Sequence, residues 1–260
     1  MHFGRTGNIA EIDFSLPPDD KMTEDLWQRR TPAGNEPLKV FIGCTEWGRK
    51  NWIGKVYPRG TKDKDFLAHY LKQFNTIELN ALFYNLQPKP VIERWASLAD
   101  GGFRFCPKFS DTISHKQQLK DVQPETDLFI DHMQCFGRNL GSCFLQLSES
   151  FGPDRAGILQ NYVRGLPRDF RICVEVRQEG WFTGANGGGT ARFATGGGGP
   201  SAAVQGTWEL LSELGIGSVI TDTPGRRGRS IFLFIIPKNY FPRRCVVMWW
   251  SNSMRHVVRR

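Results

Sequence analysis

The sequence lacks the motifs that usually mark a nucleotide-binding α/β protein. No GxGxxG follows the first predicted strand, and no GxxxxGK[ST] loop occurs anywhere in the 260 residues. Such glycine-rich loops bring backbone amides close to phosphates at the start of a helix. Their absence argues against the common nucleotide-binding doubly wound folds.

The cysteines form no recognisable framework, and no long apolar run is present. The six cysteines include no close CxxC pair, and several lie inside apolar runs such as RFCPK and SCFLQL. This pattern predicts reduced thiols in the core rather than a zinc site or disulfides. The N-terminus has no signal-like apolar region, and no segment approaches the about 18 apolar residues of a membrane span. We therefore expect a cytoplasmic protein with no membrane partner.

Acidic residues are missing from the end of the chain. After Asp222 there is no carboxylate, whereas nine lysine and arginine residues follow it. Residues 1–222 carry the other 25 basic residues and all 26 acidic ones, a net charge of −1, although the whole chain has +8. The near-neutral body therefore does not support a nucleic-acid partner, and the excess charge belongs to the tail.

Short apolar runs alternate with helical patterns from Leu38 onward, which is typical of an α/β protein with a parallel sheet. The predicted strands are 38–45, 74–80, 103–108, 142–147, 170–177 and 217–222. The clearest predicted helices are 64–74, 90–99, 124–136, 155–166 and 207–215. Nearly every strand ends in polar residues, and a barrel gathers such ends in one ring. We therefore favour a TIM-barrel-like fold over an open sheet.

Three segments fall outside this alternation of predicted strands and helices. Residues 1–37 are polar and predict an extension on the outside of the domain or a partly disordered one. Residues 183–206 are rich in Gly, Ala, Ser and Thr and predict a flexible insertion within a barrel domain of residues 38–227. Residues 228–260 form a basic tail, in which IFLFII could supply a seventh strand but no convincing helix or eighth strand follows.

Six ordered segments between about Lys39 and Arg227 resemble the YecE-like family, also called domain of unknown function 72. The segments are IGCTEWGRKNWIGKVYPRGT, FNTIELNALFY, FRFCPKFSDTISH, LGSCFLQLSESF, ICVEVRQEGWF and VITDTPGRR. The resemblance implies a TIM-barrel-like fold and no established reaction. Two departures stand out: Glu46 replaces the small residue usual before Trp47, and the Arg-rich tail replaces two further strands and a terminal helix.

The atypical tail suggests a hypothesis about the gene. Residues from about Gly228 onward would derive from a shifted reading frame or a truncated gene, leaving a barrel without its last one or two βα units. Such a barrel would have an open edge and would be prone to aggregate. An intact, in-frame gene ending in this tail would refute the hypothesis.

The candidate site consists of the polar and aromatic residues at the strand ends. The candidate catalytic residues are Glu78, Lys108, His115, Glu175 and Asp222, and the candidate substrate-binding residues are Asn80, Gln146, Arg177, Trp47 and Tyr84. Glu78 and Asn80, like Glu175 and Arg177, are two apart and share a strand face. The alternatives are structural: a polar plug in the barrel mouth, a Glu175–Arg177 ion pair, and aromatic packing under the loops.

These residue types indicate acid–base chemistry. A histidine titrates near neutral pH, a buried lysine loses its proton more readily, and an arginine can clamp a phosphate or carboxylate. The carboxylates with His115 could also hold a divalent metal, with Mg or Mn favoured over Zn because this candidate set contains only one histidine. We expect an enzyme acting on a small molecule or nucleotide, the alternatives being a non-catalytic nucleic-acid-binding protein or a non-functional truncated barrel.

Overall fold

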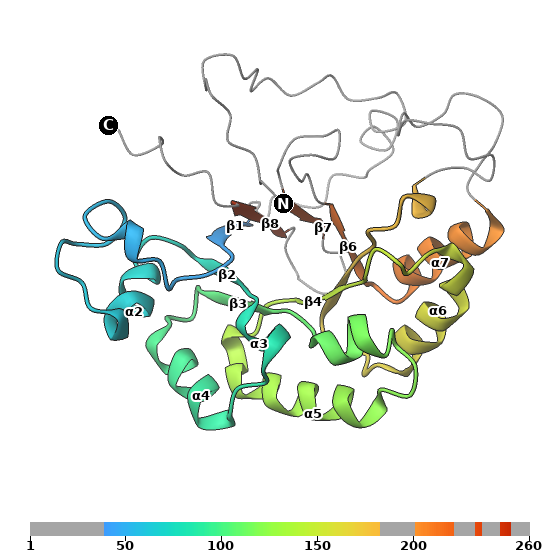
Figure 1. Ribbon diagram of the computed structural model, residues 1–260, viewed down its shortest axis with the longest axis horizontal. Coiled ribbons are helices and arrows are strands. Elements are labelled where there is room, and N and C mark those ends of the chain that lie inside the picture. Colours follow the sequence, from blue (N-terminus) through green and yellow to red (C-terminus); the bar gives the residue numbers. More distant parts are fainter. Residues whose placement is uncertain (1–38, 183–200, 221–231, 236–244, 251–260) are drawn as a thin grey trace, which may run out of the picture.

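The structure, a computed structural model, describes residues 39–182, 201–220, 232–235 and 245–250 (Figure 1). Residues 1–37, most of the predicted Gly-rich insertion and Asp222 lie outside this part of the chain. The strands are β1 (Lys39–Cys44), β2 (Thr76–Leu79), β3 (Arg104–Pro107), β4 (Cys143–Gln146), β5 (Ile172–Glu175), β6 (Gly217–Ile220), β7 (Phe232–Ile235) and β8 (Cys245–Trp250). All six predicted strands are present, each slightly shorter than its apolar run.

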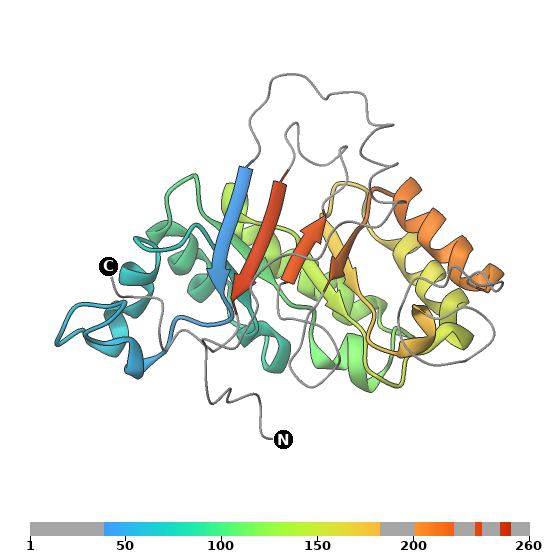
Figure 2. The same ribbon diagram turned by 90° about the horizontal axis from the view of Figure 1, so that it is seen from above.

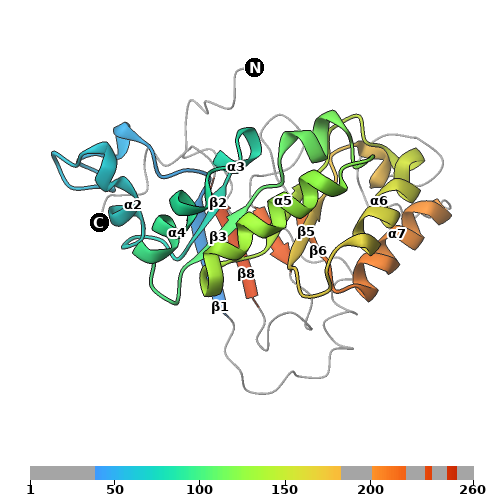
Figure 3. The same ribbon diagram turned by 90° about the horizontal axis from the view of Figure 1, so that it is seen from below.

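The helices lie between the strands as the sequence pattern predicts. They are α2 (Phe66–Tyr70), α3 (Ala81–Tyr84), α4 (Lys89–Leu98), α5 (Gln123–Met133), α6 (Ala156–Gly165) and α7 (Ala202–Glu213). Short 3₁₀ segments span Lys50–Trp52, Asp63–Asp65, Gln134–Asn139, Pro153–Arg155 and Glu179–Trp181, and a π-helical turn, η4, spans Thr112–Lys116. Helices α4 to α7 form an arc along one side of the strands (Figures 1 and 3).

Helix α7 begins earlier than the sequence suggests. It starts at Ala202, inside the predicted insertion 183–206, because the Ser201 hydroxyl accepts a hydrogen bond from the Val204 amide at 3.4 Å and caps the first turn. A serine cap satisfies an amide that the helix itself leaves unpaired. The small residues 202–206 therefore belong to the helix.

The strands form one eight-stranded sheet in the order β3-β2-β1-β8-β7-β6-β5-β4. The pairs β1–β2, β2–β3, β1–β8, β4–β5 and β5–β6 are parallel, whereas β6–β7 and β7–β8 are antiparallel. The fold is thus a mixed α/β fold with mainly parallel strands, whose β1 and β8 lie side by side in Figure 2.

The expectation that no eighth strand follows the seventh is wrong. The run CVVMWW forms β8, which pairs with β1 along six residues, from Lys39↔Cys245 to Cys44↔Trp250. Its β-branched and aromatic residues suit a strand, but no helical pattern flanks it to mark a βα unit. The linking segment 236–244 is shorter than the about a dozen residues that a parallel crossover needs, which agrees with the antiparallel pairing of β7 with β8.

The two outermost strands of this order also meet. Isolated parallel bridges join Phe105 to Leu140 and Lys108 to Phe144, and the Phe109 amide donates to the Phe144 carbonyl at 3.1 Å. The first residues after β3 therefore lie beside β4. This contact brings the polar end of β3 next to the polar ends of β4 and β5.

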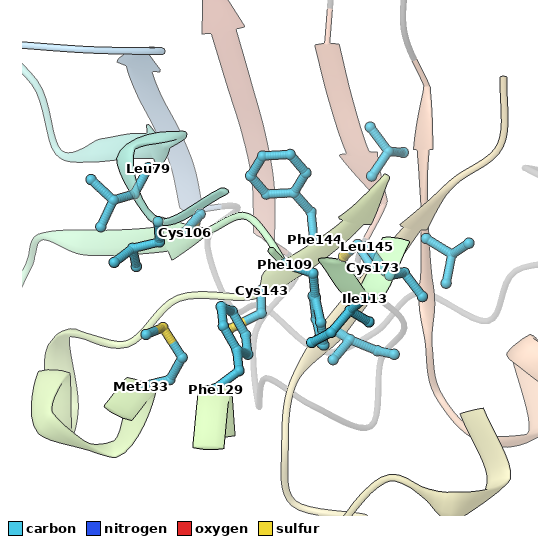
Figure 4. Close-up of a cluster of buried hydrophobic side chains, with 14 of the residues drawn as sticks. Leu79, Cys106, Phe109, Ile113, Phe129, Met133, Cys143, Phe144, Leu145 and Cys173 are labelled. Atoms are coloured by element: carbon cyan, nitrogen blue, oxygen red, sulfur yellow. The ribbon is translucent and has the colours of Figure 1, made fainter. Parts of the chain in front are cut away.

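The core packs between the strands and the arc of helices. Helix α5 buries Thr126, Phe129, Ile130 and Met133, a spacing that places all four on one face. Phe129 stacks on Phe109 with ring centroids 4.5 Å apart (Figure 4). Five of the cysteines, Cys44, Cys106, Cys135, Cys143 and Cys173, are free thiols, and all but Cys135 are buried, as predicted. No helix in the described part of the chain is long and apolar enough to cross a membrane.

Candidate functional site

The polar strand-end residues come from neighbouring strands and face the same side. In the register, Gln146 of β4 lies opposite Glu175 of β5, and Glu78 of β2 lies opposite Cys106. Lys108 follows Cys106 by two residues and therefore points to the same face as Glu78. The isolated bridge between Lys108 and Phe144 then brings the polar residues at the ends of β2 and β3 next to those at the ends of β4 and β5.

A chain of hydrogen bonds runs through four of the predicted residues. Arg177 Nε donates to Glu175 Oε1 at 2.8 Å, and Gln146 Nε2 donates to Glu175 Oε2 at 2.7 Å. Lys108 Nζ donates to Gln146 Oε1 at 2.6 Å. Glu175 is 1% exposed and Arg177 is 33% exposed at the side chain, so the ion pair leads from a buried carboxylate toward solvent.

Glu78 is a buried carboxyl group that is only half satisfied. Its Oε1 accepts a hydrogen bond from Asn80 Nδ2 at 3.0 Å, whereas its buried Oε2 has no hydrogen-bond partner among the residues that the structure describes. Burial raises the pKa of Glu78 from 4.5 to about 7, helped by the charge of Glu175 and opposed by Asn80, Lys108 and Arg177. Glu78 can therefore carry or release a proton near neutral pH.

Lys108 is a buried amine that lacks a carboxylate as its hydrogen-bond partner in the described residues. It is 9% exposed, and its Nζ lies 4.1 Å from the centroid of the Phe83 ring. Burial lowers the pKa of Lys108, although the charges of Glu78 and Glu175 oppose the change. An amine in such surroundings loses its proton more readily than an exposed lysine does.

His115 lies beside this group on the π-helical turn η4. Its ring meets Phe83 edge to face with centroids 5.0 Å apart, so Phe83 contacts both Lys108 and His115. Burial lowers the pKa of His115, and the positive charges of Lys108 and Arg177 lower it further. His115 is thus held mainly neutral at pH 7.

Ser114 contacts one ring nitrogen of His115. The buried Ser114 hydroxyl donates to the Ser110 carbonyl at 2.8 Å, and its oxygen lies 2.9 Å from His115 Nδ1. In the tautomer that carries the proton on Nδ1, the hydroxyl oxygen accepts this bond and His115 Nε2 is a hydrogen-bond acceptor. The sequence analysis missed Ser114, because a serine before a histidine carries no signal of this contact.

The remaining predicted residues lie differently. Trp47 packs edge to face on Trp95 of α4 with centroids 5.2 Å apart, and Tyr84 is 79% exposed. Glu46, expected to add a carboxylate at the strand ends, is exposed and paired with Arg49. In the described ranges, no three His, Cys, Asp or Glu side chains are placed to hold a metal ion. Asp222, part of the predicted carboxylate set, lies outside these ranges.

The fold and this site define a mixed α/β protein with a polar group at its strand ends. The family model of a protein of unknown function, DUF72, matches residues 41–247, and the chain therefore belongs to the DUF72 family. The match extends through β7 into β8. The hypothesis of a shifted reading frame stays untested.

Curated relatives resemble part of the chain. The UPF0759 protein YecE of Escherichia coli K12 is 31% identical over 143 residues, 55% of this chain and 50% of the relative. The UPF0759 protein YunF of Bacillus subtilis is 33% identical over 69 residues, 26% of this chain and 23% of the relative. The chain thus matches half or less of the length of these relatives.

Solved structures of DUF72 proteins share the fold. One from Thermotoga maritima has a TM-score of 0.54 at 21% identity, covering 73% of this chain and 67% of that one. One from Enterococcus faecalis has a TM-score of 0.52 at 19% identity, and the match covers 79% of this chain and 66% of that one. These likenesses support the α/β fold and assign no reaction.

Proposed function

We propose that this protein is an enzyme that performs acid–base chemistry on a small molecule at the carboxyl ends of β2 to β5. The observation that carries the proposal is Glu78, a buried carboxyl group whose Oε2 has no partner in the described structure. An unsatisfied buried carboxyl oxygen costs stability, and such costs are concentrated at functional sites. A pKa raised to about 7 suits a group that must both give and take a proton.

The groups at the site have separate roles in proton transfer and substrate binding. Glu78 Oε2 is the proton donor and acceptor, and His115 Nε2 accepts a hydrogen bond or a proton from the substrate. Arg177, held through Nε by Glu175 and 33% exposed at its side chain, favours a substrate with a carboxylate or phosphate group. The substrate is then a small anionic compound with an ionisable C–H or O–H bond.

We also propose that the sheet is TIM-barrel-like, with the strand ends around one mouth. The bridges between β3 and β4 support this arrangement, since they link the two outermost strands of the sheet order. The antiparallel β7 is a departure from eight identical βα units. The cytoplasm is our proposed compartment, supported by the free thiols.

The proposal is tested by hydrogen exchange into substrates. Dihydroxyacetone, pyruvate, glycolate and dihydroxyacetone phosphate are incubated with the protein in D₂O, and the loss of C–H signals is followed by proton NMR. We expect the wild type to exchange at least one compound and Glu78→Gln to be slower by about 100-fold or more. Glu93→Gln, a change of the same kind at an exposed glutamate, is the control. Equal rates in the wild type and Glu78→Gln would contradict the proposal.

A non-catalytic nucleic-acid-binding protein is the alternative. The exposed Tyr84 and the guanidinium of Arg177 are the features that favour it, because bases stack on aromatic rings and phosphates bind arginine. Binding of a fluorescent single-stranded oligonucleotide would then weaken linearly in log affinity against log salt. Loss of binding in Tyr84→Ala with no effect of Glu78→Gln would support the alternative over the enzyme.

A further inference from the structure

We infer that Lys108 is a nucleophile that forms an imine with a small aldehyde or ketone. This inference rests on the proposed function, since Glu78 supplies the proton transfers that imine formation needs. It adds a covalent step and a substrate class, the carbonyl compounds, to the acid–base site. A lysine that forms imines must be mainly unprotonated and must be held in place.

The hydrogen-bond partner of Lys108 is neutral, and the structure shows why. Nζ donates to the amide oxygen of Gln146 at 2.6 Å. The side-chain amide of Gln146 cannot rotate by 180° to exchange its oxygen and nitrogen, because the nitrogen donates to Glu175 Oε2 at 2.7 Å. Glu175 in turn is paired with Arg177. The carboxylate of Glu175 is thus paired with Arg177, and the hydrogen-bond partner of Lys108 is an amide rather than a carboxylate.

Burial of Lys108 also favours the neutral amine, whereas its aromatic neighbours attract the ammonium form. The residue is 9% exposed, and its Nζ lies 4.1 Å from the Phe83 ring centroid and 5.9 Å from that of Phe144. Burial lowers the pKa of Lys108, and the nearby Arg177 lowers it further, while the charges of Glu78 and Glu175 oppose both. His115, the other titratable group at the site, is itself held mainly neutral. Burial is the largest of these influences.

The reaction balances without an added oxidant or reductant. The lone pair of the amine attacks the carbonyl carbon, a C–N bond forms, and the C=O π electrons move to oxygen. The oxygen takes a proton from the Glu78 carboxyl group, which recovers one from the new ammonium. The Glu78 carboxyl group then protonates the carbinolamine hydroxyl, which leaves as water while the nitrogen lone pair forms the C=N bond. The Glu78 carboxylate finally takes the remaining proton from nitrogen. The net products are an imine and one water molecule.

Reductive trapping tests the inference on the wild-type protein. The protein is incubated at neutral pH with pyruvate, dihydroxyacetone or acetaldehyde in the presence of sodium cyanoborohydride, which reduces an imine to a stable secondary amine. Peptide mapping by mass spectrometry then locates the adduct. We expect Lys108 to be labelled at least about tenfold faster than the exposed Lys72, although Lys72 is more accessible.

Two variants separate nucleophilicity from charge. Lys108→Arg keeps a positive charge but has no amine nucleophile, so the adduct at this position should disappear while labelling at Lys72 is unchanged. Gln146→Glu places a carboxylate against the amine and should slow labelling at pH 7 by about tenfold for each unit by which the pKa of Lys108 rises. Labelling of this variant should recover at alkaline pH.

The outcomes distinguish this inference from the proposed function. Absence of an adduct at Lys108, or labelling no faster than at Lys72, overturns the imine. If hydrogen exchange dependent on Glu78 persists in that case, the acid–base proposal stands without it. An unchanged labelling rate in Gln146→Glu would mean that the amide does not hold the amine neutral, and the inference would fail on that ground.

Discussion

The environment of Glu78 differs between the unfolded and the folded chain. An exposed glutamate ionises freely, but in the folded protein Glu78 is 7% exposed and its Oε2 has no partner among the described residues. Burial raises its pKa from 4.5 to about 7. The folded state therefore binds a proton more tightly than the unfolded state does. Stability from this group is present below about pH 4.5 and is lost as the pH rises toward 7.

Replacing this carboxyl group should remove that pH dependence. At about 1.4 kcal/mol for each tenfold change in acidity, the rise in pKa from 4.5 to about 7 means that ionising Glu78 costs roughly 3 kcal/mol by about pH 8. Urea unfolding of Glu78→Gln should therefore show a gain of that size over the wild type at about pH 8 and little gain at about pH 5. Lys108 acts in the opposite direction, because a lowered pKa makes folding more favourable as the pH rises. Glu93→Gln should show no such gain, and an equal gain at both pH values would contradict the assignment.

At the scale of elements, the junction between β1 and β2 is the tightest point near the site. Gly43 is paired with Thr76, and a Cβ at Gly43 would lie 2.0 Å from the Thr76 carbonyl oxygen. Tyr70 of α2 ties the same strands together, since its hydroxyl accepts from the Cys44 amide at 2.6 Å and donates to the Thr76 carbonyl at 2.9 Å. Because β2 carries Glu78, this junction sets the position of the proposed acid.

Gly43→Ala should therefore separate the two strands. We expect a loss of about 2–4 kcal/mol in the free energy of unfolding, since backbone atoms cannot move aside as a flexible side chain can. Gly157→Ala on α6 is the matched control, because a Cβ there meets nothing within 4 Å and alanine favours a helix. A thermal melt of each variant measures the difference. Equal melting temperatures would show that β1 and β2 pair less closely than described.

At the scale of the whole molecule, β8 holds the sheet together. It lies between β1 and β7 in the sheet order and pairs with both. Its sequence lies inside the basic tail that we predicted to be outside the barrel. Without β8, the backbone groups of β1 would form an open edge, and the apolar Val40 and Ile42 on β1 are already exposed.

Truncation tests the part that the tail plays. A chain ending at residue 244 lacks β8, and we expect it to lose cooperative unfolding and to aggregate at micromolar concentration. A chain ending at Trp250 keeps all eight strands and should unfold like the full protein. Sedimentation velocity and circular dichroism distinguish the two. If the shorter chain is a stable monomer, then β8 is dispensable and the tail hypothesis gains support.

The sequence by itself determined the order and type of most elements. The six strands and the helices between them follow from local periodicity, which records how each segment alternates apolar and polar residues. It also indicated which polar residues end the strands, and the register of β4 with β5 places two of them, Gln146 and Glu175, opposite each other. The periodicity and the strand-end residues are local properties, so they are readable without the rest of the chain.

Only the tertiary structure determined which side chains bind one another and which strands pair. Gln146 presents its oxygen to Lys108 because Glu175 binds its nitrogen, and that geometry depends on the register of β4 with β5. β8 became recognisable through its pairing with β1, since its own pattern has no helix to mark a unit. Contacts between segments far apart in the chain, and the burial they produce, set the proton affinities of Glu78 and Lys108. No local pattern encodes them.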